Sequence, residues 1–173
     1  GHLELALVST VEELADVRNR LATQQNLTLV AVELRGPVET LPELPAGLRV
    51  FVERSWCDSF EVPDGAMLKL RCGGAEAGDV PSSTQLGGAI EHCVRHDQAF
   101  KLTAGLHHAV RTDGEHGFLN VLAAVGAAID GGDPVPKLPE KLARLQPLID
   151  KSIAKQPADR FAAGFAFDAD LAR

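Results

Sequence analysis

The stretch Leu27–Leu34 (LTLVAVEL) limits the possible folds more than any other, because its apolar residues run almost without interruption. A run of this length is typical of a strand in a parallel sheet, which is buried on both faces. Other segments also predict strands, and helical patterns follow several of them. We therefore expect an α/β fold with a predominantly parallel sheet of about five strands and helices outside it. The predicted strands are residues 3–9, 27–34, 49–54, 66–72 and 99–105, and the predicted helices are residues 10–25, 84–96 and 117–129.

The number of predicted strands is too small for a closed (β/α)₈ barrel, which needs eight strands and about 250 residues. We therefore expect an incomplete, barrel-like sheet. The 173 residues are expected to form a single domain, with residues 135–173 as its helical C-terminal extension and one or two helices between residues 138 and 155. An incomplete barrel exposes sheet edges, so we expect a homodimer or a partner N-terminal domain to cover them.

The net charge and the cysteine content limit which partners and which cellular compartment we expect for this chain. The net charge is −7, and the chain lacks the basic stripe that a nucleic-acid-binding surface needs. No apolar run approaches the roughly 20 residues of a membrane-spanning helix. The three cysteines, Cys57, Cys72 and Cys93, are odd in number and lack CxxC spacing. This pattern favours a reducing, cytoplasmic compartment over a disulfide framework.

Charged residues lie in the C-terminal halves of four successive predicted strands. In α/β folds this end of the strands is the ligand-binding end. Strand alternation places Glu33 on one face with Ala31 and Leu29. Two interpretations remain open, namely a structural ring of ion pairs, such as Glu53 with Lys69 and Glu33 with Arg71, or a ligand site that uses the same pairs. The charged set comprises Glu33, Glu53, Lys69, Arg71 and Lys101.

The stretch Ala99–Asn120 (AFKLTAGLHHAVRTDGEHGFLN) joins a predicted strand, a glycine turn and a histidine-rich loop to a helix. Its histidines are candidates for acid–base catalysis or metal ligation, but their spacing fits no compact zinc motif. Lys101 is a candidate Schiff-base nucleophile, or else a lysine that only pairs with a carboxylate. We assign no metal ligand, and the sequence names no cofactor. The further candidates are His107, His108, Arg111 and His116, with Gly73 and Gly74 as a possible cradle for a phosphate or carboxylate, or as a flexible loop.

The phrases FKLTAGLHHAVR and HGFLN, together with MLKLRCGG, resemble those of a bacterial family without an assigned activity. The resemblance covers roughly residues 27–125. It implies a longer parent protein of which this chain is the C-terminal portion, and the tail AGFAFDADLAR departs from the family pattern. More weakly, the strand lysine resembles that of TIM-barrel aldolases, at the level of fold only. The positions that the family resemblance singles out are Glu33, Glu53, Lys69, Arg71, Lys101, His107, His108, Arg111 and His116.

These observations favour a barrel-type lyase or isomerase that acts on a small anionic substrate, either a carboxylate or a phosphate. An aldolase-like lyase is one candidate of this type. Lys69 and Arg71 would hold the anion, and Lys101 would act as nucleophile or electrostatic stabiliser. Glu33 or Glu53, with one of the paired histidines, would move protons. The alternative is a non-catalytic ligand-binding or assembly domain whose ion-pair ring is structural.

Overall fold

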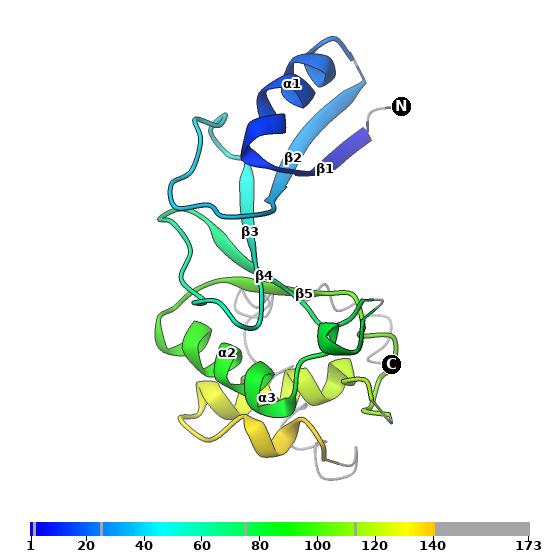
Figure 1. The fold of residues 1–173 in the computed structure, drawn as a ribbon, viewed down its shortest axis with the longest axis vertical. Coiled ribbons are helices and arrows are strands. Elements are labelled where there is room, and N and C mark those ends of the chain that lie inside the picture. Colours follow the sequence, from blue (N-terminus) through cyan, green and yellow to red (C-terminus); the bar gives the residue numbers. More distant parts are fainter. Residues whose placement is uncertain (2, 25, 75, 113, 141–173) are drawn as a thin grey trace. The chain divides into compact units, whose positions relative to one another are not determined.

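In a computed structural model the chain is an α/β protein built on a five-stranded sheet (Figure 1). The structure describes residues 1, 3–24, 26–74, 76–112 and 114–140. The strands are β1 (Leu3–Ser9), β2 (Leu27–Leu34), β3 (Arg49–Arg54), β4 (Met67–Arg71) and β5 (Phe100–Thr103), and their order in the sheet is their order in the chain. β1 pairs in parallel with β2, and β2 with β3. The predicted fold class is confirmed, and the linear strand order leaves the sheet open, as expected for an incomplete barrel.

Three helices accompany the sheet. They are α1 (Val11–Ala22), α2 (Ser83–Arg95) and α3 (Phe118–Ile129), with two 3₁₀ turns, η1 (Ala77–Asp79) and η2 (Val135–Lys137). The hydroxyl of Thr10 accepts from the backbone N–H of Glu13 and caps α1, at the start of the helix predicted over residues 10–25. Ser82 caps α2 in the same way, and the Gln85 side chain accepts in return from the Ser82 N–H. Most of the predicted helical segment from residue 138 to 155 lies outside the described residues.

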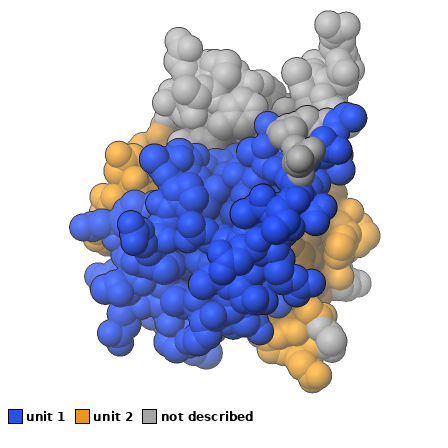
Figure 2. Space-filling model, turned by 90° about the horizontal axis from the view of Figure 1, so that it is seen from above, with its two compact units in different colours: residues 1–69 blue, residues 70–173 orange. Residues whose placement is uncertain are grey.

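The chain divides into two compact units, residues 1–69 and residues 70–173, and the boundary falls within β4 (Figure 2). The first unit contains β1, α1, β2 and β3. The described part of the second contains α2, β5, α3 and the two 3₁₀ turns. Among the described residues, no helix is both long enough and apolar enough to cross a membrane.

The core of the first unit lies between α1 and one face of its strands. Leu14 is the buried residue of α1, and it packs with Val32 and Leu34 of β2 and with Val50 and Val52 of β3. Burying aliphatic side chains of this size stabilises the folded state by roughly 1.5–3 kcal/mol each. The opposite face of β2 and β3 is therefore the one that carries the strand glutamates.

A β-bulge in β2 sets which residues share that face. Leu5 of β1 pairs with Leu29, but the next residue, Ala6, pairs with Ala31, so Val30 is an extra residue in β2. An extra residue shifts the alternation of side chains by one position. Leu29 consequently packs against the core with Val32. The expectation that Leu29 shares a face with Glu33 is wrong for this reason.

The core of the second unit is formed largely by α2 and α3, which lie side by side (Figure 1). Leu86, Ile90 and Cys93 are buried on α2. A methyl carbon added at Gly87 would lie 2.5 Å from Val135 Cγ2, so this glycine lets η2 approach α2 closely. Burial raises the pKa of the Cys93 thiol to about 12, which makes it unreactive at neutral pH.

Candidate functional site

The first group of candidate residues is an ion triad in the first unit, formed by Lys69, Glu33 and Glu53. Lys69 Nζ lies 2.8 Å from Glu33 Oε2 and 2.6 Å from Glu53 Oε2. The lysine side chain is only 3% exposed, and the glutamates are 14% and 19% exposed. The register of β2 and β3 brings the two glutamates together, because Glu33 pairs with Phe51, and Glu53 lies two residues further along the same face of β3.

The triad contains two carboxylates and one ammonium group, so it is one positive charge short of neutrality. Arg35 supplies part of the difference, since its Nε lies 3.9 Å from Glu53 Oε2, although its side chain is 52% exposed. Glu53 Oε2 accepts no hydrogen bond from the described residues, so its 2.6 Å contact with Lys69 Nζ is an ion pair held by charge attraction. The Lys69 ammonium group is thus engaged by protein carboxylates on two sides.

The second group lies in the second unit, on the segment between β5 and α3, which we call the histidine loop (residues 104–112 and 114–117). Ala104 and Gly105 begin it with φ angles of 57° and 67°, in the left-handed region. A methyl carbon added at Gly105 would lie 2.1 Å from the Cys72 carbonyl oxygen. The strand end therefore requires glycine here on two grounds, backbone conformation and space.

The two glycines after β4 have neighbours of their own. A methyl carbon at Gly73 would lie 2.6 Å from Gly105 Cα, so the ends of β4 and β5 touch through two glycines. A methyl carbon at Gly74 would lie 2.0 Å from Asp79 Oδ2, and that oxygen accepts a hydrogen bond from the Glu76 N–H. Close packing accounts for both glycines, and the cradle interpretation stays a prediction.

The histidine loop closes on the start of α3. His108 forms a parallel bridge with Gly117, and its carbonyl accepts from the Phe118 N–H at 3.0 Å. A methyl carbon at Gly117 would lie 2.4 Å from the backbone nitrogen of Arg111. These contacts satisfy a helix-start N–H group and hold both ends of the loop in place.

Two imidazoles project from this fixed loop into solvent. His107 is exposed, and the side chain of His108 is 50% exposed. His108 Nε2 lies 3.5 Å from Glu115 Oε2. That oxygen is shielded from solvent and accepts no hydrogen bond from the described residues. The arrangement is a carboxylate beside a half-exposed histidine, which the carboxylate can orient.

His116 behaves differently, since it is completely buried. Its Nε2–H donates to the Pro81 carbonyl at 2.7 Å, and its Nδ1 accepts from Arg111 Nη1 at 2.8 Å. These partners assign the neutral tautomer with the proton on Nε2. Burial lowers the pKa of His116 below its usual value, and the nearby Arg111 cation acts in the same direction.

Asn120 completes this network from the first turn of α3. It is fully buried, and its Oδ1 accepts from the backbone N–H of Arg111 at 2.8 Å. Its Nδ2 donates to the carbonyls of Lys137 and Glu140, at 3.1 Å and 2.9 Å. Arg111 is therefore held at its backbone by Asn120 and at its guanidinium by His116.

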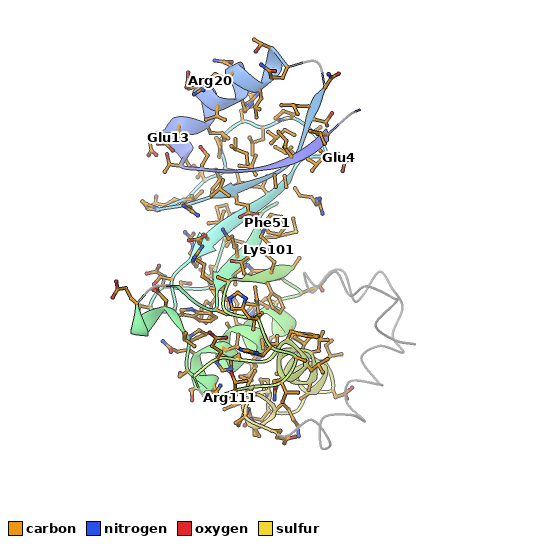
Figure 3. The ribbon with its side chains drawn as sticks, turned by 90° about the vertical axis from the view of Figure 1, so that its right-hand side faces the viewer. Glu4, Glu13, Arg20, Phe51, Lys101 and Arg111 are labelled. Atoms are coloured by element: carbon orange, nitrogen blue, oxygen red, sulfur yellow. The ribbon has the colours of Figure 1, made fainter. Side chains whose placement is uncertain are left out.

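The remaining candidates are Arg71, the last residue of β4, and Lys101, which lies in the N-terminal half of β5 and not in the C-terminal half where it was expected. Arg71 is exposed at the end of β4, and Lys101 is half-buried on β5. Each takes part in a polar interaction, so neither is an isolated charge. Lys101 and Arg111 are labelled in Figure 3. Among the described residues, no three histidine, cysteine or acidic side chains gather closely enough to hold a metal ion.

Sequence reasoning missed Asn120 and Glu115. Asn120 is the polar residue in FLNVLAAVGAAI, an otherwise apolar helix, and this contrast is a signal that could have singled it out. A buried amide on such a helix must find partners, because an unpaired one costs roughly 1–3 kcal/mol. Glu115 gave no comparable signal, since a lone acidic residue in a polar loop is ordinary.

No family model matches the chain, and neither the curated proteins nor the solved structures provide a match.

Proposed function

We propose that this chain is an acid–base enzyme of the lyase or isomerase type, which acts on a small carboxylate or phosphate at the histidine loop. The observation that supports this is the pair formed by His108 and Glu115, 3.5 Å apart on a loop whose ends are fixed. A half-exposed imidazole beside a carboxylate is a common arrangement for moving a proton to or from a substrate.

In the proposed chemistry, the carboxylate of Glu115 faces Nε2 of His108 and favours the tautomer with its proton there. Nδ1 is then the basic nitrogen, and it takes a proton from a carbon next to the substrate's carbonyl or carboxyl group. Glu115 stabilises the imidazolium that forms. His107 is the second exposed imidazole and returns a proton, while Lys101 acts as a nucleophile or stabilises negative charge.

The test uses exchange of carbon-bound hydrogen, because it needs no knowledge of the full reaction. The protein is incubated in D₂O with a panel of small 2-oxo acids, hydroxy acids and phosphate esters, and loss of C–H signal is followed by proton NMR. We expect exchange with at least one compound, and loss of that exchange in His108→Asn. The matched control is His96→Asn, which removes an exposed histidine at the C-terminal cap of α2. Exchange that survives in His108→Asn would refute the assigned base.

A second candidate function is a non-catalytic ligand-binding or assembly domain. The closed ion triad of Lys69, Glu33 and Glu53 favours it, because an ammonium group engaged by two carboxylates is not offered to an anionic substrate. Failure of every compound to exchange, with intact anion binding, would favour this second function.

We also propose that the chain works in the cytoplasm as a homodimer or beside a partner domain. β1 is an edge of the sheet, and its Leu3 and Val8 side chains are 61% and 42% exposed. β1 carries one charged side chain, Glu4, and no lysine or proline, so its largely apolar edge is suited to pairing with another strand. Sedimentation equilibrium of the wild type and Val8→Lys tests this. A wild type that stays monomeric would refute the homodimer.

A further inference from the structure

Arg111 is held in place at two points, its backbone and its side chain. Its backbone N–H donates to Asn120 Oδ1, and its guanidinium donates to His116 Nδ1. Both acceptors are fully buried polar side chains. Burying two polar side chains is favourable only when their hydrogen bonds are made, and here their other polar groups bond to backbone carbonyls.

The guanidinium itself keeps most of its binding capacity. It has five N–H donors in one plane, and among the described residues the bond to His116 uses one of them. That bond fixes the side chain, whose free rotation would otherwise oppose ligand binding. A half-buried, pre-positioned guanidinium on the same loop as the exposed His107 and His108 matches the planar, two-oxygen geometry of a carboxylate or phosphate.

We propose that Arg111 is the anion-binding residue of the histidine loop, and that His116 and Asn120 are positioning residues that hold it. The biological ligand would be the carboxylate or phosphate group of the substrate, so this inference rests on the proposed function. The positioning residues act only through Arg111. Lys69 has no part in this site, since it is engaged by Glu33 and Glu53.

The arrangement has a consequence for pH. His116 accepts the Arg111 hydrogen bond only while Nδ1 is unprotonated. Protonation of Nδ1 would turn it into a donor that faces the Arg111 donor, and the resulting imidazolium would repel the Arg111 cation. Burial and the Arg111 cation both disfavour the protonated form of His116, while the Pro81 carbonyl, which accepts from Nε2–H, favours it and only partly offsets them, so the pKa of His116 is lowered. Acidification therefore releases Arg111.

The test measures binding of inorganic phosphate and of malonate by amide chemical shifts of the full chain. We expect Arg111→Gln to weaken binding about 10-fold or more, as for the loss of a hydrogen bond between charged groups. The matched control is Arg95→Gln, which removes the same charge from an exposed pair on α2 and should stay within about twofold of wild type. Equal losses in the two variants, or no saturation with either probe, would overturn the proposal.

The pH profile separates positioning from a merely structural role. His116→Gln can donate to the Pro81 carbonyl and accept from Arg111 but cannot be protonated, so it should match wild type at pH 7.5. The ratio of wild-type to variant affinity should then fall on acidification. This ratio cancels the titration of phosphate, His107 and His108. A constant ratio would overturn the positioning role. Binding that depends on Arg111 without any hydrogen exchange would refute the enzyme and leave this inference standing.

Discussion

Replacing Lys69 with methionine tests the ion triad most directly. The substitution leaves Glu33 and Glu53, which are 14% and 19% exposed, without their shared counter-charge. Removing one partner of a buried ion pair costs about 3–5 kcal/mol, because the remaining charge is left unpaired. Arg35 offsets little of this, since a contact at 3.9 Å from a half-exposed side chain contributes less than about 1 kcal/mol. We therefore expect Lys69→Met to lower the free energy of unfolding by about 3 kcal/mol or more.

The assay is urea unfolding followed by the fluorescence of Trp56, which is the single tryptophan and lies in the first unit. Adding Glu33→Gln and Glu53→Gln to Lys69→Met removes the unpaired charges and should restore much of the lost stability. The control is Glu91→Gln, which breaks an exposed pair with Arg95 and should change stability by no more than about 0.5 kcal/mol. A Lys69→Met protein within 1 kcal/mol of wild type, or a triple variant as unstable as the single one, would refute the reasoning.

Three further predictions concern the second unit. Gly105→Ala should lower the free energy of unfolding by more than about 2 kcal/mol, measured by circular dichroism in urea, because the added carbon meets the Cys72 carbonyl at a left-handed φ. Borohydride reduction in the presence of small aldehydes and 2-oxo acids should give a peptide-mass adduct at Lys101 if it forms a Schiff base, and an unchanged adduct in Lys101→Ala would show that another amine reacts. Because burial lowers the pKa of His116, the unfolded chain binds its proton more readily, so stability should be full above about pH 6.5 and fall on acidification. His116→Gln should lose stability less steeply, measured as the protection of α3 amides against hydrogen exchange, and identical slopes would contradict the assignment.

Much of the fold could be predicted because its signals are local. Apolar runs bounded by turn residues gave all five strands, and Thr10 marked the start of α1. The bulge at Val30 could not be predicted, because it exists only in the pairing of β2 with β1. The residues of a single strand show how its side chains alternate between the two faces. They do not show where pairing with a neighbouring strand leaves one residue unpaired.

The candidate site was predictable in its residue types but less so in its contacts. The pairing of Glu53 with Lys69 follows from adjacent strands with opposite charges, and it was foreseen as one of two interpretations. That Lys69 also binds Glu33 depends on three strands in register. The burial of His116 depends on the Pro81 carbonyl, which lies 35 residues earlier in the chain. No local sequence pattern predicts such a distant partner.

The agreement between strand order and chain order bears on how the protein is made. In the first unit each new strand joins the edge left by the strand before it, so no segment has to enter between two strands that are already paired. Pairs that are close in sequence close small loops and form quickly. A ribosome releases the chain from its N-terminus, so β1, α1 and β2 can assemble while later residues are still being translated, and each finished edge serves as the template for the strand that emerges next.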